Sequence, residues 1–375
     1  MTSRLLQDGT FFFPGPTEVR PEVLAAMTKP MIPHRGAAFE SIFGRLQDSL
    51  AVIFGTKRPV YVSSSSATGL MEAAVRCAPP GPVLSVVNGA FSARFANIAT
   101  ACGRETDVIE VPWGDTVEMS QLEERLRTRR YAAVTVAHSE TSTGALTDVR
   151  SATRLARAHG AMCLVDSVTG VGGAELRFDE WEMDFALTGS QKALALPPGL
   201  AFAVASPEYI ARAPESTGRG LYFDIVEFEA YAAKHQTPNT PAIPLFFAAD
   251  VQLAAIVAEG MEARWARHAE MARRTYAWVD ALAGQLGEAF RVTARAGHRS
   301  PTVTSVMLPS SMPSATVTRA VRERGYTIGS GYGKNRDTTI RIGHMGDHTV
   351  EALEKCLAVV GTVLAELKGR LRTPA

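Results

Sequence analysis

The sequence predicts an α/β protein in which a large domain with a mostly parallel, seven-stranded sheet is followed by a small α+β domain. Seven short apolar segments, bounded by Gly, Pro, Asn or Ser, alternate with helical patterns over roughly residues 50–250. A long alanine-rich, charged pattern then runs from about residue 244 to 285, and strand-like segments return after it. Strands that alternate with helices in this way are typical of a parallel sheet covered on both faces.

The large domain supplies the predicted parallel sheet. Its expected strands cover residues 59–66, 81–89, 106–111, 131–140, 161–167, 184–190 and 200–206. Helical patterns between them cover residues 67–78, 120–130 and 149–160. Ligands of such sheets bind at the carboxyl ends of the strands. The polar residues that follow these strands are therefore the candidates for a functional site.

The C-terminal third predicts the small domain. One or two long helices over about 244–285 would link the domains, and a final amphipathic helix runs from residue 349 to about 371. Strand-like segments between them cover residues 302–309, 327–333 and 338–346. We expect three parts, namely an N-terminal segment 1–20 that packs with the small domain, a large domain 21–262 and a small domain 263–375.

Composition and charge disfavour several classes of partner. Of the 375 residues, 46% are hydrophobic, and the net charge of +1 favours neither nucleic acid nor an anionic membrane as a partner. The four cysteines lie singly, without metal-ligand spacing, which favours reduced thiols and no metal site. No signal-peptide pattern and no uncharged apolar run of about 18 residues occurs. We therefore expect a cytoplasmic protein without a membrane span.

A turn of small residues follows the first predicted strand and leads into a helix. Ser66, Ala67 and Thr68 stand where backbone N–H groups at a helix N-terminus would bind a phosphate. Helix capping alone explains a serine and a threonine here at least as well. The fingerprints G-x-G-x-x-G and G-x-x-x-x-G-K-[ST] are absent, which disfavours dinucleotides and nucleoside triphosphates as ligands.

Other strands end in residues that suit a planar, cationic ring. Phe91 follows the second strand, where its ring could stack on a ligand, although such a phenylalanine more often packs in a core. Asp166 ends an apolar strand, and a buried carboxylate needs a cation such as a pyridinium nitrogen. His138, Glu140 and Thr141 could hydrogen-bond the same ring, or could equally form turns and caps.

Lys192 lies in a tight frame of small and polar residues, in the segment LTGSQKALALPPG at 187–199. A lysine that is desolvated beside other cationic groups loses its proton readily and becomes a nucleophile toward carbonyls. An anion-binding turn, a stacking ring, a buried acid and such a lysine together suit an aldehyde that carries a phosphate and a pyridine ring. These features predict pyridoxal 5′-phosphate (PLP) as the cofactor.

The sequence resembles the class V aminotransferases, in particular their alanine–glyoxylate and serine–pyruvate branch. The resemblance rests on the segments DSV at 166–168 and TGSQKAL at 188–194, and it extends from PGPT at 14–17 through SETSTG at 139–144 to TIRIG at 339–343. It implies a PLP-dependent transferase fold of the aspartate aminotransferase type, fold type I. It also implies that residues 21–262 form the PLP-binding domain and that the protein is a homodimer.

The resemblance assigns roles around the cofactor ring. It implies that Lys192 forms the Schiff base and moves protons between Cα and C4′. Asp166 would pair with the pyridine nitrogen, and Val168 would pack beneath the ring. Phe91 would stack on the ring, where several family members have tryptophan, and Thr141 would lie near its 3′-oxygen.

The resemblance also implies residues at the phosphate and at the substrate. The phosphate donors would be Ser66, Ala67, Thr68 and Gln191, with Thr237 and Thr240 of the segment QTPNTP reaching the site from the neighbouring subunit. Gly15 would lie beside the substrate. Arg341 would bind the substrate carboxylate, a role that suits a guanidinium fork on physical grounds, although a structural ion pair is the rival interpretation.

The implied activity is that of a transaminase with a ping-pong mechanism, in which serine or alanine donates its amino group to glyoxylate or pyruvate. The segment PHRG at 33–36 is similar to one that binds the substrate's phosphate in phosphoserine aminotransferases. His34 and Arg35 therefore keep phosphoserine, with 2-oxoglutarate as acceptor, and 2-aminoethylphosphonate open as substrates. A structural role of both residues, in the N-terminal segment or a dimer contact, is equally open.

Three alternatives to amino transfer share part of this pattern. A PLP lyase or hydrolase of the kynureninase kind shares the lysine and stays open. A cysteine desulfurase needs a nucleophilic cysteine on a mobile loop, whereas Cys356 lies within the last helical pattern. A catalytically silent PLP-binding protein is disfavoured because the lysine, the aspartate and the arginine are all present.

Overall fold

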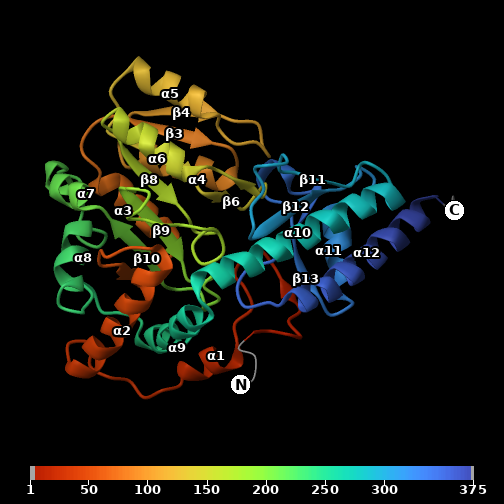
Figure 1. Cartoon of the computed structure of the whole chain (residues 1–375), viewed down its shortest axis with the longest axis horizontal. Coiled ribbons are helices and arrows are strands. Elements are labelled where there is room, and N and C mark those ends of the chain that lie inside the picture. The colour runs from red at the N-terminus through yellow and green to blue at the C-terminus, as the bar shows by residue number, and fades with distance from the viewer. Residues whose placement is uncertain (1–4, 373–375) are drawn as a thin grey trace.

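The computed structural model describes residues 5–372 and contains a large and a small lobe, each built on a sheet (Figure 1). The sheet of the large lobe has seven strands in the order β2-β10-β9-β8-β5-β3-β4. They are β2 (Tyr61–Ser63), β3 (Val83–Val87), β4 (Thr106–Glu110), β5 (Ala133–Ala137), β8 (Met162–Asp166), β9 (Phe185–Gly189) and β10 (Ala201–Ala205). Each strand lies inside one of the seven predicted segments, which confirms the α/β fold class.

The large sheet is mostly parallel, as predicted. β3 pairs in parallel with β4 and β5, and the parallel run continues through β8 to β9. β10 is antiparallel to both of its neighbours, β9 and β2. β2 therefore runs again in the direction of the parallel strands, and its carboxyl end lies at the same edge of the sheet as theirs.

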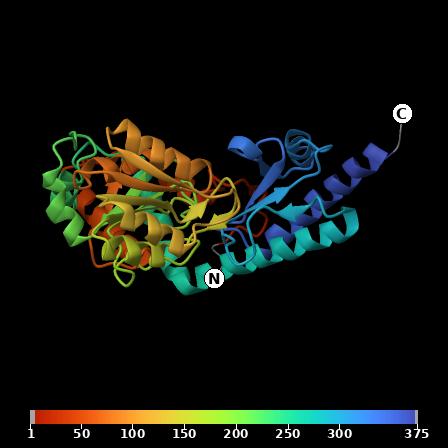
Figure 2. The same cartoon turned by 90° about the horizontal axis from the view of Figure 1, so that it is seen from above.

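Helices cover both faces of this sheet (Figures 1 and 2). One face packs against α2 (Ala37–Phe54), α5 (Met119–Thr128), α6 (Val149–Ala158) and α9 (Ile243–Glu259). The other packs against α3 (Ala67–Cys77), α4 (Ala90–Ala101), α7 (Pro207–Arg212) and α8 (Ile225–Ala232). Successive residues of a strand face opposite ways, so Val134 of β5 belongs to the first core and Ala133 to the second.

Four of these helices, α3, α5, α6 and α9, match predicted helical patterns, whereas α2, α4, α7 and α8 were not predicted. The sequence pattern predicts Phe91 just after a strand, whereas the structure places it in the first turn of α4. No side chain of its own segment caps α4. The N–H groups of Phe91 and Ser92 instead donate to the Glu140 carboxylate, which belongs to a distant segment. The start of α4 therefore has no local sequence signal.

The small lobe contains a five-stranded sheet in the order β1-β13-β14-β12-β11. Its strands are β1 (Phe11–Phe12), β11 (Arg291–Val292), β12 (Val303–Met307), β13 (Thr327–Ser330) and β14 (Thr339–Gly343). The last three lie inside predicted segments. β1 pairs in parallel with β13, so the N-terminal segment supplies a strand to a sheet that otherwise belongs to the C-terminal part of the chain.

One long helix runs from the large lobe along the small one (Figures 1 and 2). This helix, α10 (Met261–Leu286), follows α9 after a bend of 85°, and Gly260 between them has a φ of +85°. α11 (Ser314–Arg322) and α12 (Val350–Arg372) pack in the same lobe. The remaining short elements are α1 (Pro21–Ala26), β6 (Ser139–Glu140), β7 (Ala145–Leu146), η1 (Ala213–Glu215) and η2 (Gly333–Asn335).

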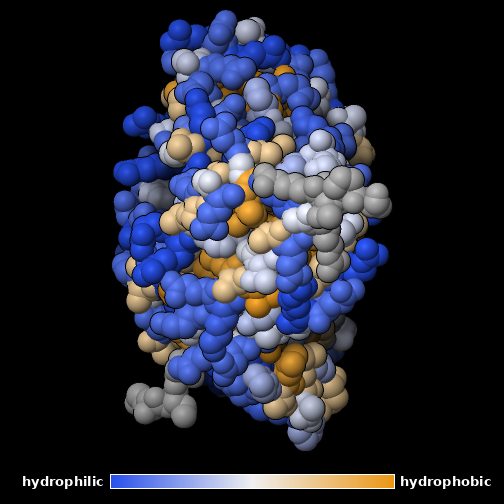
Figure 3. All heavy atoms as spheres, turned by 90° about the vertical axis from the view of Figure 1, so that its right-hand side faces the viewer, coloured by the Kyte–Doolittle hydropathy of each residue, from blue (hydrophilic) through white to orange (hydrophobic). Residues whose placement is uncertain are grey.

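The domain boundaries proposed after residues 20 and 262 stay predictions. The outer ends of the first and last predicted parts, residues 1–4 and 373–375, lie outside the described residues. Among the described residues, no single helix is long and apolar enough to cross a membrane. The helices α9 and α10 reach the necessary length and apolar composition only when taken together, and they are bent by 85° relative to each other. The face at the small-lobe end is largely hydrophilic, with separate small hydrophobic areas (Figure 3).

Candidate active site

Most of the predicted site residues meet in one pocket of about 310 Å³. Its lining includes Gly15, Ser66, Ala67, Thr68, Phe91, Thr141, Asp166, Val168, Gln191 and Lys192. Apart from Gly15, these residues end or follow β2, β3, β5, β8 and β9 in the sequence, with Asp166 as the last residue of β8. They come together because those strands end at the same edge of the sheet. The pocket therefore lies where a parallel sheet is expected to bind a ligand.

Lys192 lies in the turn after β9, residues 190–196, which we call the lysine turn. Lys192 is 7% exposed, and its Nζ donates to the carbonyl of Pro14. The Lys192 carbonyl accepts from the Thr17 hydroxyl at 3.0 Å. Gly15 has a φ of +100°, and a Cβ there would meet the Lys192 side chain. The N-terminal segment therefore closes over the lysine and requires a glycine at that point.

Asp166 and Lys192 have strongly shifted pKa values. The Asp166 carboxylate accepts the Val168 N–H at 2.9 Å and forms no ion pair within residues 5–372. Burial raises the pKa of Asp166 from 3.8 to about 7, against the Val168 hydrogen bond and the charge of Lys192. Burial, and then the Arg341 guanidinium, lower the pKa of Lys192 from 10.5 to about 7. Two groups of opposite type that both titrate near neutral pH are typical of an acid–base site.

These shifts predict an unusual pH dependence of stability for the cofactor-free protein. Between about pH 4 and 7 the folded chain holds a proton on Asp166 that the unfolded chain releases, so the free energy of unfolding falls as pH rises. Between about pH 7 and 10 the folded chain lacks a proton on Lys192 that the unfolded chain keeps, so the free energy of unfolding rises again. The contribution of this pair to stability is therefore lowest near pH 7.

The variant Lys192→Met tests the upper part of this dependence. At pH 6 it should raise the free energy of unfolding by on the order of 2–4 kcal/mol, since one pKa unit corresponds to about 1.4 kcal/mol. The gain should shrink toward pH 10, because the buried amine is already neutral above about pH 7 and the unfolded chain starts to lose the same proton near pH 10. Urea unfolding of the cofactor-free proteins at pH 6, 8 and 10 measures it. A variant that is less stable than the wild type at pH 6 would contradict the shifted pKa.

The helix α3 begins at the pocket without a side-chain cap. Ser66 is its N-cap residue and makes no capping hydrogen bond through its hydroxyl. Ser66, Ala67 and Thr68 line the pocket together with Gln191. An uncapped helix N-terminus offers backbone N–H donors and the positive end of the helix dipole. This end of the pocket therefore suits a phosphate group.

A stack of side chains from both lobes forms another wall of the pocket. The rings of Phe91 and Tyr332 lie 5.1 Å apart between centroids, at an interplanar angle of 24°. The guanidinium carbon of Arg94 lies 4.9 Å from the Phe91 centroid, and its Nη2 donates to the Tyr332 hydroxyl at 3.2 Å. Because Tyr332 follows β13, the small lobe takes part in closing the pocket.

Arg341, on β14, contacts the pocket wall from the small lobe. Its Nε donates to the Ser330 carbonyl at 2.8 Å, its Nη1 to the Thr141 carbonyl at 3.3 Å, and its Cζ lies 5.5 Å from the Tyr332 centroid. Burial lowers the pKa of Arg341 to about 10. It forms no ion pair within residues 5–372, so the rival interpretation of a structural ion pair is wrong. Its Nη2 is therefore available to a carboxylate.

Two residues suggested as hydrogen-bond partners of the ring, Glu140 and His138, have partners within the protein. Glu140 accepts from the first turn of α4 and from the Ser142 N–H and hydroxyl, at 3.0 and 2.6 Å. His138 pairs its Nδ1 with the Ser167 hydroxyl at 2.9 Å, and burial lowers the pKa of His138 to about 4. Glu140 thus caps α4 and the turn at Ser142, whereas His138 is held by Ser167. Thr141, in contrast, lines the pocket as predicted.

The segment 236–240 lies outside this pocket. Thr237 and Thr240 line a separate small hollow with Ser63 and Ser64 of the same chain. These two serines precede the turn at residues 66–68 that would bind the phosphate. A contribution of both threonines to the neighbouring subunit's site stays a prediction.

Arg35 holds that segment in place. Its guanidinium donates to the carbonyls of Thr237 and Pro238 at 2.8 and 3.2 Å, and to the Gln236 side chain at 3.0 Å. Neither Arg35 nor His34 lines the pocket of its own chain.

Within residues 5–372, no group of three or more His, Cys, Asp or Glu is placed to hold a metal ion.

The pocket also contains residues that no sequence pattern predicted. They are Pro16, Met71, Arg94, Ser139, Thr169 and Tyr332. Arg94 lies one helical turn after Phe91, so it would have been found if α4 had been predicted. Tyr332 lies in a loop of the small lobe, and no local pattern in the sequence marks it as part of the site.

Comparison with solved structures defines the fold class. An alanine–glyoxylate aminotransferase from Nostoc sp. superimposes with a TM-score of 0.88 at 28% sequence identity, over 97% of this chain and 96% of the other. The molecule therefore has the fold of a fold type I aminotransferase. The class V aminotransferase family matches residues 11–341, and the chain belongs to this family.

Curated relatives match over nearly the whole chain. The L-aspartate–glyoxylate aminotransferase of Paracoccus denitrificans is 31% identical, over 95% of this chain and 91% of its own. The serine–glyoxylate aminotransferase of Arabidopsis thaliana is 30% identical, over 95% and 90%. A protein of Synechococcus sp. named soluble hydrogenase, small subunit, is 33% identical, over 94% and 92%. The predicted resemblance to glyoxylate-type class V aminotransferases is confirmed, while the relatives differ in the activity for which they are named.

Proposed function

We propose that the protein is a PLP-dependent aminotransferase that moves the amino group of serine or alanine to glyoxylate or pyruvate. The observation that carries the proposal is that Lys192 and Asp166 line one pocket at the ends of the strands, while Arg341 contacts the wall of this pocket at Thr141. Membership of the class V aminotransferases supports amino transfer. Relatives named for glyoxylate support that acceptor.

The donors and acids of the pocket fit PLP. Asp166 is a buried carboxylate without a cation partner in the described part of the chain, which suits a protonated ring nitrogen. The uncapped start of α3 with Gln191 suits the phosphate. Lys192, whose pKa is about 7, suits the aldehyde, which it would hold covalently. When bound, PLP supplies a sink for the electrons left at the substrate's Cα after proton removal.

Lys192, Asp166 and Arg341 would then have separate roles in amino transfer. The Lys192 Nζ takes the proton from the substrate's Cα, because burial keeps much of this amine unprotonated near neutral pH. Asp166 holds the proton on the ring nitrogen. Arg341 fixes the substrate carboxylate through its unpaired Nη2. Because the same residues serve the amino acid and the oxo acid, we expect ping-pong kinetics.

The variant Arg341→Ala tests the carboxylate role. It should raise KM for both the amino donor and the oxo acid by about 10- to 100-fold, because a charge-assisted hydrogen bond contributes about 1.5–3 kcal/mol. Steady-state kinetics with each substrate varied in turn measures the change. The matched control is Arg336→Ala, an exposed arginine in the loop that precedes β14, which should leave both KM values unchanged. An unchanged KM in Arg341→Ala would remove this residue from carboxylate binding.

A matrix of half-reactions tests the choice of substrates. The donors are serine, alanine, aspartate, phosphoserine and 2-aminoethylphosphonate, and the acceptors are glyoxylate, pyruvate and 2-oxoglutarate. We expect the highest kcat/KM for serine or alanine with glyoxylate or pyruvate. A preference for phosphoserine or 2-aminoethylphosphonate would select the alternative that uses His34 and Arg35. A cleaved fragment in place of an oxo acid would indicate a lyase.

An acidic donor such as aspartate is the second candidate, and Arg94 favours it. Arg94 lines the pocket, and its guanidinium forms no ion pair within residues 5–372. A second guanidinium without an ion pair, which contacts Tyr332 as Arg341 does, would suit a second carboxylate. One relative is named for aspartate and glyoxylate. In the matrix, aspartate would then exceed serine and alanine, and Arg94→Leu would reduce kcat/KM for aspartate alone.

We also propose that the protein works as a homodimer with shared active sites. Leu221 is 83% exposed and Tyr222 46%, which is unusual for large apolar side chains. The Tyr222 carbonyl accepts from the Asn239 side chain at 3.4 Å, so these residues adjoin the segment of Thr237 and Thr240. This supports a subunit contact beside the segment that would enter the neighbouring site. Sedimentation velocity would measure the oligomeric state.

A further inference from the structure

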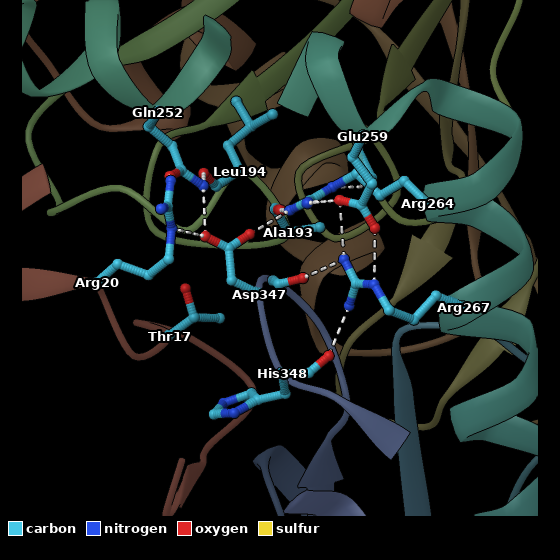
Figure 4. A network of polar contacts seen from close by, with 12 residues as sticks. Thr17, Arg20, Ala193, Leu194, Gln252, Glu259, Arg264, Arg267, Asp347 and His348 are labelled. Atoms are coloured by element: carbon cyan, nitrogen blue, oxygen red, sulfur yellow. Dashed lines mark hydrogen bonds and ion pairs between the residues drawn. The ribbon is translucent and has the colours of Figure 1, made fainter. Parts of the chain in front are cut away.

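A buried polar network joins the two lobes beside the lysine turn (Figure 4). At its centre the Asp347 carboxylate accepts from Arg20 Nε at 2.7 Å and from Arg264 Nη2 at 3.0 Å. The Gln252 amide donates to the same carboxylate at 2.9 Å and accepts from Arg20 Nη2 at 2.7 Å. Burial alone would raise the pKa of Asp347, but Arg264, Gln252 and Arg20 hold it below its ordinary value. The carboxylate therefore stays ionised in the interior.

The same residues hold the lysine turn. Arg264 Nη2 donates to the carbonyl of Ala193 at 2.6 Å, and Gln252 Nε2 donates to the carbonyl of Leu194 at 3.0 Å. These two carbonyls belong to the residues directly after the lysine. Ala195 has a φ of +51°, a left-handed conformation that costs a non-glycine residue about 1–3 kcal/mol. The turn is thus held from outside in a conformation that it would not favour alone.

The network also holds the segment that follows the Arg341 strand. Asp347 itself belongs to this segment, which leaves β14 and leads into α12. Arg267 donates to the carbonyls of Gly346 and His348, at 3.1 and 2.6 Å (Figure 4). Gly346 lies directly against the lysine turn, since a Cβ at this position would come within 3.3 Å of the Ala195 Cβ. The network around the Asp347 carboxylate therefore contacts both the lysine turn of the large lobe and the segment that follows β14 in the small lobe.

We propose that Asp347, with Arg264 and Gln252, positions the lysine turn relative to the strand of Arg341, and so sets the geometry in which a substrate meets both groups. None of the three lines the pocket, and two of them contact the lysine turn through the carbonyls of Ala193 and Leu194, so they are positioning residues. The Asp347 carboxylate binds the N-terminal segment, α10 and, through Gln252, the lysine turn. A network that stabilised one lobe alone would not need all three of these contacts. The proposal rests on the roles proposed above for Lys192 and Arg341.

The variant Asp347→Asn tests this proposal in the full chain. The amide keeps the shape of the carboxylate but directs an NH2 group at donors, so contacts on one side are lost. The first readout does not depend on catalysis: trace acetylation of the cofactor-free protein at pH 5 to 10, with mass spectrometry of the peptide that contains Lys192, gives the apparent pKa of that amine. The second readout is kcat/KM of the PLP-loaded enzyme.

We expect Asp347→Asn to raise the apparent pKa of Lys192 by about one unit or more, toward its ordinary value, because a displaced turn exposes the amine and separates it from Arg341. We expect kcat/KM to fall by about 10²-fold, the effect of misplacing reacting groups by about 1 Å. A changed Lys192 pKa in a protein that shows no amino transfer would keep the positioning role and would count against the proposed function only.

The matched control is Asp184→Asn. Asp184 is equally buried and ionically paired, with Arg157 at 2.6 Å, but it lies at the opposite end of β9 from the lysine turn. Both variants should lower the urea midpoint of unfolding. If Asp347→Asn matches Asp184→Asn in the Lys192 pKa and in kcat/KM, the network is only structural and the proposal is wrong.

The variant Gln252→Met keeps the proposal testable if Asp347→Asn does not fold. Methionine preserves the volume of glutamine and introduces no charge, but it loses the bonds to the Leu194 carbonyl and to Asp347. The pKa of Lys192 should again rise, by less than in Asp347→Asn. A pKa equal to that of the wild type would overturn the proposal.

Discussion

Replacing Lys192 with alanine should reduce amino transfer by at least about 10³-fold while the protein stays folded, because both the covalent attachment and the proton transfer at Cα would be lost. The buried amine, with a pKa of about 7, is the group in the pocket suited to both roles. Single-turnover half-reactions with serine and with glyoxylate measure the loss. Borohydride treatment followed by peptide mapping should attach the cofactor to position 192 in the wild type and leave this position unlabelled in the variant.

The control for this experiment is Lys57→Ala. Lys57 is exposed in the large lobe and does not line the pocket with Lys192, so its loss should change neither the rate nor the labelled position. If the wild type is labelled at another lysine, or if Lys192→Ala retains more than about a tenth of the wild-type rate, the proposed chemistry is wrong.

Asp166→Asn should lower kcat by about 10²–10³-fold while the protein still binds PLP. Removing one preorganised charged group from a reacting centre costs about this much. The amide keeps the shape of the side chain and its hydrogen bond from Val168, but it has no charge to hold a proton on the ring nitrogen. Visible absorbance should therefore report a bound cofactor, and single-turnover rates should show the loss in both half-reactions.

Asp184→Asn is the appropriate comparison for this variant as well. Burial also raises the pKa of Asp184, to about 6, but this acid accepts the Cys163 N–H at the far end of the same strands. Its replacement should affect stability and leave kcat near the wild-type value. A near-normal kcat in Asp166→Asn would contradict the role of this carboxylate as the partner of the ring.

The strands of the large sheet could be predicted from the sequence because each is a short apolar segment with its own boundaries. The order of β2, β10 and β9, in which one strand is reversed, has no such signal, since pairing is decided between segments. The start of α4 was missed for a related reason. Its first N–H groups are capped by Glu140 from a distant segment, so nothing near residue 90 marks a helix start.

Some residues of the candidate site could likewise be predicted from the sequence, and others could not. Lys192 and Asp166 could be selected because an ionisable residue at the end of an apolar strand is conspicuous in any sequence of this type. Tyr332 could not be selected, because its contact with Phe91 exists only where the small lobe meets the large one. The network around Asp347 was missed likewise, because its members come from four separate parts of the chain.

The sequence by itself determined the α/β class, the family and the chemical nature of the groups at the ends of the strands, because periodicity, turn residues and strand-end motifs are local properties. The tertiary structure decided how those groups are tuned and placed. The pKa values of Lys192 and Asp166 near 7 come chiefly from burial, which no isolated segment has. The position of Arg341 against the pocket depends on the packing of one lobe on the other. Burial and packing between lobes are properties of the whole fold, so only the structure could supply them.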